Sequence, residues 1–217
     1  MDIWALWLDA IRMAITASAD VGLGAGLAIV VVTILLRTLL LPLAWPVAYR
    51  ACIRQRKMRV LQPELQALRD KFASDPDAYL KKMKELYEQH GLALVDIKGV
   101  VGSLVQLPVF LGMFQALRDA GAGARFLWVS SLSRPDVLLA VIAGLTTALM
   151  MSVNPDLPEQ MRLLMILLPS VIAIVAALQF SSALAIYWAT SNTFSALQTV
   201  ALHAVVRHRV QSGAIKI

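Results

Sequence analysis

Five apolar segments divide this chain, and each is close to the length that a helix needs to cross a lipid bilayer, about 20 residues. They lie at 27–48, 99–117, 136–153, 161–179 and 183–206. The whole chain is 59% hydrophobic, a composition typical of a polytopic membrane protein and not of a soluble domain. The segments therefore predict an all-α membrane protein whose five spans form a transmembrane helix bundle.

Residues 49–98 interrupt the apolar segments with eleven Lys and Arg residues and seven acidic residues. Apolar residues recur there at helical spacing in two groups, which a short polar link separates. Asp75 in this link can cap a second helix that begins at Pro76, and Gly91 can end that helix. We therefore expect a hairpin of two charged helices outside the membrane.

Residues 1–26 precede the first span and carry three aspartates against one arginine. Apolar side chains recur at helical spacing over 3–17, and Trp4 and Trp7 suit the depth of the lipid headgroups. This pattern predicts an amphipathic helix that lies in the outer interface of the membrane. The glycines of 20–26 then provide a turn into the first span.

The basic residues predict how the chain is oriented. Fifteen Lys and Arg residues lie in the 49–98 hairpin, in the turn that carries Arg162, and in the short tail 207–217, whereas four lie in the other loops. Because cytoplasmic loops carry the excess of Lys and Arg, the hairpin and the C-terminus are expected in the cytoplasm and the N-terminus outside. A bacterial plasma membrane is the expected location, since no transit peptide is evident.

Motifs for several kinds of chemistry are absent from the sequence. The chain has no HExxH zinc motif, no GxxxxGK[ST] phosphate loop and no GxSxG nucleophile motif. Cys52 is the only cysteine, which excludes an internal disulfide, and His90, His203 and His208 are expected near the inner face and not as metal ligands. We predict that the protein is not an enzyme and holds no cofactor and no metal. The net charge of +6 fits cytoplasmic loops, so no nucleic-acid site is predicted.

Arg37 lies inside the first apolar segment, in the stretch VVTILLRTLLLPL. Either end of the apolar region is roughly 20 Å away at 1.5 Å per residue, which is too far for an arginine side chain to reach. A central arginine costs about 2.5–3.5 kcal/mol on insertion scales, so it normally faces protein or water. No acidic residue is expected in the membrane interior to form an ion pair with it, so a functional role is favoured over contacts with backbone carbonyls.

Other spans carry polar side chains that could share a cavity with Arg37. The last span has Trp188, Asn192, Ser195 and Thr199 at helical spacing, with Tyr187 and Ser191 beside them. Other spans supply polar side chains at Thr33, Ser103, Gln106, Thr146 and Thr147. For any single residue, ordinary hydrogen bonding between helices is the simpler interpretation. The whole set fits a hydrated, positively charged cavity that opens toward the basic hairpin.

The order of these parts, and five stretches of sequence, resemble the YidC-type membrane protein insertases of bacteria, mitochondria and chloroplasts. The stretches are TILLRTLLLPL, KMRVLQPELQALRDKF, VQLPVFLGMFQAL, FLWVSSLS and IYWATSNTFSALQT. The resemblance implies a five-span bundle around a hydrophilic groove that is open to the cytoplasm and the lipid and closed on the outside. It places the groove arginine at Arg37, its polar partner at Thr33, the groove aromatic at Trp188 beside Tyr187, and a mobile hairpin at 50–91. Where the family has a Pro-containing turn before the last span, this chain has FSSALAIY, which predicts a looser outer turn.

The sequence is thus interpreted as a membrane protein insertase and chaperone. Its predicted groove residues are Arg37, Thr33, Tyr187, Trp188, Asn192, Ser195 and Gln106. The expected partners are nascent membrane-protein clients and the lipid bilayer, with the ribosome and the Sec translocon as further candidates. Two alternatives stay open: an assembly scaffold that holds client helices without translocation, and an anion-binding transport protein.

Overall fold

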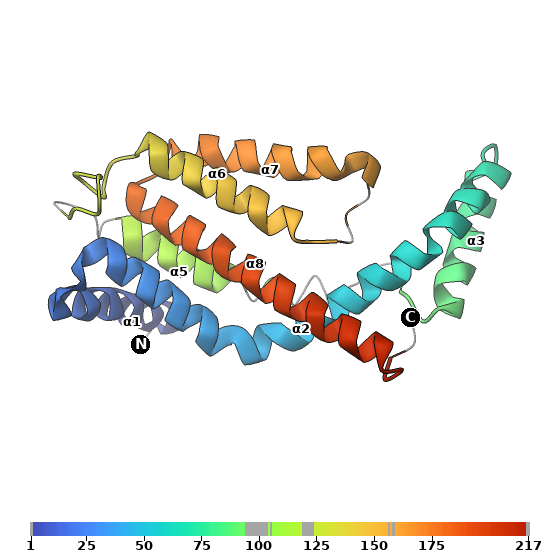
Figure 1. The fold of residues 1–217 in the computed structure, drawn as a ribbon, viewed down its shortest axis with the longest axis horizontal. Helices are drawn as coiled ribbons and strands as arrows, with labels where there is room; N and C mark the ends of the chain where they lie inside the picture. Colours follow the sequence, from blue (N-terminus) through green and yellow to red (C-terminus); the bar gives the residue numbers. More distant parts are fainter. Residues whose placement is uncertain are drawn as a thin grey trace. The chain divides into compact units, whose positions relative to one another are not determined.

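The computed structural model describes residues 2–93, 104, 106–118, 124–155, 157 and 159–215, and this part of the chain is built from helices (Figure 1). The helices are α1 (Ile3–Ser18), η1 (Ala19–Leu23), α2 (Gly24–Lys71), α3 (Pro76–Gln89), α5 (Gln106–Arg118), α6 (Val137–Ser152), η2 (Glu159–Met161), α7 (Arg162–Ala177) and α8 (Ser182–Gln211). Within the described ranges no strand occurs, only one isolated bridge between Phe126 and Val129. The predicted all-α class is confirmed.

The chain forms two compact units. The first contains Met1–Pro42 and Val105–Ala201, and the second contains Leu43–Leu104 and Leu202–Ile217. Helices α2 and α8 each run without a break through the predicted ends of their spans at residues 48 and 206. Side-chain polarity changes at those positions, but backbone hydrogen bonds do not depend on it, so each helix continues. Ile3–Lys71 is the one helical stretch that is long and apolar enough to cross a membrane by the length and composition of the described residues.

A sharp turn at Ala19–Leu23 reverses the chain between α1 and α2. Gly22 has φ 95° and Gly24 has φ 70°, conformations that glycine adopts without steric cost. Figure 1 shows α1 running back beside the first part of α2 and beside α5. The first residues of α1, Asp2 to Trp4, accordingly line a pocket together with Leu40 of α2.

This return path brings the start of α1 beside the middle of the first apolar segment. Leu40 is sixteen residues beyond Gly24, or about 24 Å along the helix axis. The packing of α1 on α2 does not fix its depth in a membrane, so the helix in the outer interface stays a prediction.

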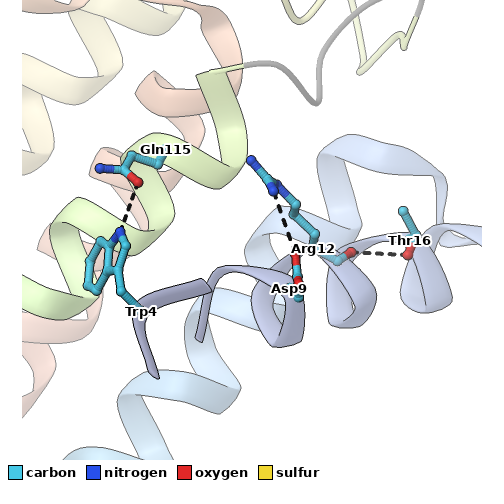
Figure 2. A network of polar contacts seen from close by, with 5 residues as sticks. All are labelled: Trp4, Asp9, Arg12, Thr16 and Gln115. Atoms are coloured by element: carbon cyan, nitrogen blue, oxygen red, sulfur yellow. Dashed lines mark hydrogen bonds and ion pairs between the residues drawn. The ribbon is translucent and has the colours of Figure 1, made fainter. Parts of the chain in front are cut away.

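Two indole groups hold α1 against α5. Trp7 Nε1 donates to the Pro108 carbonyl oxygen at 3.2 Å, and Trp4 Nε1 donates to Gln115 Oε1 at 3.1 Å. Figure 2 shows the Trp4 contact, together with the exposed ion pair between Asp9 and Arg12 on another face of α1. The attachment of α1 thus depends mainly on its tryptophans and on the buried side chains of Ile11 and Ile15.

We expect Trp7→Ala to detach α1 from α5. The variant loses a hydrogen bond and the indole packing, and the cost should be on the order of 2 kcal/mol, below the 3–5 kcal/mol typical of fully buried aromatic residues. Hydrogen–deuterium exchange over α1 should accelerate. Met13→Ala, at a side chain that is exposed on the same helix, should leave the exchange unchanged. Equal exchange in the Trp7 variant and the wild type would show that the indole does not hold α1.

Helices α6 and α7 pack through small residues and turn their large side chains outward. Gly144 of α6 lies against Ile174 and the Ser170 carbonyl of α7, and a Cβ atom at Gly144 would overlap the Ile174 side chain. The buried residues of α7 are Ser170, Ala173 and Ala177. Its leucines, including Leu163 and Leu167, are exposed. Small residues at the helix interface with large apolar residues outside are typical of helices packed in lipid.

The loop before α6 is fastened to the start of α8. Ser182 is 0% exposed, and its hydroxyl donates to the Arg134 carbonyl at 2.6 Å while its backbone N–H donates to the same oxygen at 2.9 Å. The Ala183 N–H donates to the carbonyl of the buried Leu132. These three hydrogen bonds fasten the turn, so the structure speaks against the looser turn predicted from FSSALAIY.

The second unit brings together the C-terminal half of α2, the helix α3 and the end of α8. Leu61 of α2 packs against Leu86, Tyr87 and Leu92, which lie on α3 and just after it. Asp75 caps α3 through a 3.0 Å hydrogen bond from the Ala78 N–H. On the α3 surface, the hydrogen bond from Lys82 lowers the pKa of Glu85, and this exposed ion pair adds little to stability.

The end of α8 is also engaged in this unit. Cys52 of α2 is buried against Leu202 and Val206 of α8. Arg209 donates to the Tyr49 hydroxyl at 3.1 Å and lies 5.3 Å from the centre of the Tyr49 ring. The predicted tail 207–217 is thus helical as far as Gln211 and is packed on α2 over this part.

Candidate functional site

Arg37 lies on α2, one turn after Thr33, and both residues belong to the first compact unit. Its side chain is half-buried, and it interacts electrostatically with Tyr187 of α8. The structure thus brings together two of the predicted groove residues from the first and last spans. A guanidinium held at this depth keeps its charge, because arginine does not deprotonate in proteins.

An aromatic row lines the contact between α5 and α8 next to this pair. Tyr187 is 3% exposed, and its ring centre lies 6.3 Å from that of Phe110. The row continues through Phe114 to Phe180 in an edge-on contact of 5.5 Å. Tyr187 therefore presents a polar hydroxyl toward Arg37 and an apolar ring toward α5.

Most hydroxyl groups of the predicted polar set are already satisfied by their own helices. Thr33 is 1% exposed, and its hydroxyl donates to the Ile29 carbonyl at 2.6 Å. On α8, Thr199 donates to the Ser195 carbonyl at 2.8 Å. Such bonds to the preceding turn satisfy the donor without any partner helix. The hydroxyl groups of Thr33 and Thr199 are consequently less available to a ligand than the composition of their spans suggests.

Asn192 forms a hydrogen bond between helices. Its Nδ2 donates to Thr147 Oγ1 of α6 at 2.7 Å, and the Thr147 hydroxyl in turn donates to the Ala143 carbonyl at 2.7 Å. The Thr147 hydroxyl thus accepts one bond and donates another. The arrangement matches the simpler interpretation of the polar stripe, in which Asn192 holds α8 against α6.

We expect Asn192→Leu to weaken the contact between α6 and α8 by about 0.6–1.7 kcal/mol, the range for hydrogen bonds between membrane helices. A double-mutant cycle with Thr147→Val, measured by denaturant titration in detergent, should give a coupling of that size. If Asn192→Leu impaired insertion without any change in stability, the Asn192 amide would instead contact client proteins.

The remaining predicted residues are only partly placed. Trp188 and Ser195 are half-buried on α8. Gln106 begins α5, but its side chain lies outside the described part of the structure, as does the whole of Ser103. Among the described residues, no group of three or more His, Cys, Asp or Glu side chains could hold a metal ion.

Two pockets of the first unit are lined by described residues, and Arg37 is not among the residues that line them. One has a volume of about 580 Å³, is largely apolar, and is lined by α1, Leu40 and the start of α5. The other has a volume of about 360 Å³ and lies between Phe114, Ser133 and the residues before α8. The predicted hydrophilic groove around Arg37 therefore stays a proposal.

Known proteins identify the family of this chain. The sequence profile of the 60Kd inner membrane protein family matches residues 17–209. The chain belongs to this family. Two of its relatives are a YidC membrane protein insertase of Halalkalibacterium halodurans, 38% identical over 80% of this chain and 68% of the relative, and the insertase MisCA of Bacillus subtilis, 32% identical over the same shares.

A third member of the 60Kd inner membrane protein family, the YidC membrane protein insertase of Oceanobacillus iheyensis, is 32% identical over 83% of this chain and 75% of the relative. The fold resembles the crystal structure of an active YidC insertase with its first transmembrane domain resolved, with a TM-score of 0.65 and 23% identity over 92% of this chain. This chain spans 47% of that protein. Membership of the family supports the predicted plasma-membrane location.

Sequence reasoning missed several contacts of the second unit. His203 was expected only near the inner face, and its ring nitrogen Nδ1 lies 3.5 Å from Cys52 Sγ. Arg54 and Lys57 were counted among the basic residues of the hairpin, and both donate to backbone carbonyls near the end of α3. One signal in the sequence could have indicated the contacts with α3: a dense group of basic residues can bind the carbonyl groups at a helix C-terminus.

Proposed function

We propose that this chain is a membrane protein insertase that uses the charge of Arg37 to admit a polar flank of a client into the membrane. The observation that carries the proposal is the half-buried guanidinium of Arg37 beside Tyr187. Membership of a family whose named members are membrane protein insertases supports it. No bond is made or broken in this process, so the protein does not act as an enzyme.

The proposed mechanism lowers a hydration barrier. An acidic or polar flank loses water as it enters the bilayer, and burying such a group unpaired is costly. The Arg37 charge and the Tyr187 hydroxyl replace part of that water. The next residue, Trp188, and Ser195, about two turns further along α8, are further candidate groove residues. The apolar segment of the client then moves into the lipid, and the burial of about 20 apolar residues supplies the driving force.

The cytoplasmic hairpin would receive clients, with the ribosome and the Sec translocon as candidate partners. In this proposal the N-terminus lies outside and the C-terminus in the cytoplasm. The basic residues of α2 and α3, which the positive-inside pattern places there, support this orientation.

The scaffold alternative is favoured by one observation: the Asn192–Thr147 bond uses a groove residue to hold helices together. A rescue experiment separates the two functions. In bacteria depleted of their resident insertase, this chain should restore the insertion of a small single-span client, measured by protease protection of its outer flank. A chain that stabilises clients against degradation but leaves the flank unprotected would be a scaffold.

The anion-transport alternative predicts a different result. Liposomes that contain the purified chain would then show an anion flux that Arg37→Ala abolishes. We expect no flux above that of protein-free liposomes.

A further inference from the structure

Basic side chains in the stretch Arg54 to Lys57 contact two different parts of the second unit. Arg54 Nη2 donates to the Ala93 carbonyl at 2.7 Å, and Lys57 Nζ donates to the His90 carbonyl at 3.2 Å. Arg56 Nη2 lies 3.5 Å from both the backbone carbonyl oxygen and Nδ1 of His203 on α8. One turn of α2 therefore contacts the end of α3 on one side and α8 on another.

The contacts with α3 are at its C-terminal end. His90 follows the last helical residue, and Gly91 adopts φ 64°, so the chain leaves the helix there. The last carbonyl groups of a helix have no hydrogen-bond donor within it. Positive side chains at a helix C-terminus satisfy such carbonyls and the helix dipole. Leu92 then folds back, with its N–H donating to the Tyr87 carbonyl at 2.8 Å.

The contacts with α8 gather at the His203 ring. Arg56 Nη2 and Cys52 Sγ both lie 3.5 Å from Nδ1 of His203. Cys52 is 3% exposed and His203 is 6% exposed, so these contacts are made away from solvent.

We propose that Arg54, Arg56 and Lys57 form a coupling junction through which the end of α3 and the end of α8 stabilise each other. Because the three side chains leave the same turn of α2, freeing one side of the junction changes the geometry available to the other. The junction links the hairpin to the end of α8 within the second unit. The inference concerns contacts within this chain and stands apart from the proposed insertase function.

The single cysteine provides a native probe of the junction. In the purified full chain, the rate of Cys52 alkylation by a maleimide reports how often α8 separates from α2. Arg54→Gln combined with Lys57→Gln removes the contacts with α3 and leaves Arg56 and His203 in place. We expect alkylation to accelerate at least fivefold, although neither substituted residue touches Cys52. A rate within twofold of the wild type would overturn the coupling.

Two variants calibrate this measurement. Arg56→Gln breaks the α8 side directly and should also accelerate alkylation. Arg69→Gln removes the same charge from an exposed position of α2 and should not change the rate. Acceleration by Arg69→Gln equal to that of the double variant would overturn the junction, because net charge alone would then explain the effect.

A second experiment loosens α8 and measures the effect on the end of α3. It decides the proposal if circular dichroism shows that the double variant has lost its helices. Coupling between two sites is reciprocal, so loosening α8 must loosen the end of α3 by the same factor. In His203→Ala, hydrogen exchange of the Leu92 amide should accelerate at least fivefold. Unchanged exchange at Leu92 would overturn the proposal, and neither measurement depends on whether the chain inserts clients.

Discussion

Arg37→Ala should reduce the insertion of a client with an acidic outer flank at least tenfold, the factor that about 1.4 kcal/mol produces. The half-buried guanidinium is the positive group that the structure describes beside Tyr187 of α8. Without it, the flank loses water and gains no opposite charge, so the barrier to its transfer rises. Arg37→Lys should retain part of the activity, because an ammonium keeps the charge but not the planar fork of donors. Protease protection of the flank in depleted cells measures both effects.

A second arginine provides the matched control. Arg12 lies on α1, is exposed, and forms a 3.6 Å ion pair with Asp9 of the same helix. Arg12→Ala removes the same side chain and charge, and insertion should stay at the wild-type level. Full insertion by Arg37→Ala, with the variant present in the membrane at normal abundance, would contradict the role of the charge for that client.

Gly144→Val should destabilise the packing of α6 on α7 by about 3 kcal/mol, the upper end of the usual cost of overpacking. A Cβ atom at this position overlaps the Ile174 side chain and lies 3.0 Å from the Ser170 carbonyl oxygen. The side chain could rotate away, but the carbonyl belongs to the backbone of α7, so the two helices must move apart. Thermal unfolding in detergent should show a lower midpoint.

Leu145→Val is the control for this substitution. Leu145 neighbours Gly144 on α6 but is 63% exposed, so a change of shape there meets no partner helix. Its unfolding midpoint should match the wild type within error. A Gly144→Val variant as stable as Leu145→Val would show that α6 and α7 do not approach as closely as the structure describes.

The helices could be predicted from the sequence because their signals are local. The cap at Asp75 and the glycine that follows α3 depend on residues within one turn, and both lie where the sequence predicts the ends of α3. The continuity of α2 across residue 48 could not be predicted, since a change of composition was taken for a break in the helix. The path of α1 toward Leu40 depends on contacts more than thirty residues apart in sequence, which periodicity does not encode.

The candidate site shows the same limit. A charged residue within an apolar run identifies Arg37 without any structure, because its burial has an energetic cost. The polar stripe of α8 was ambiguous, since Asn192 fits a groove and a helix contact equally by spacing. The sequence showed Thr147 only as one of several polar residues on other spans. The packing of α6 on α8 identifies it as the partner of Asn192.

Reconstitution of the purified chain alone tests the central claim most directly. Phospholipid vesicles with and without the protein would receive a newly synthesised single-span client with an acidic flank, and protease protection of the flank would be measured. We predict protection well above that in protein-free vesicles, and at least tenfold less with Arg37→Ala. Protection equal to that in protein-free vesicles would contradict the account.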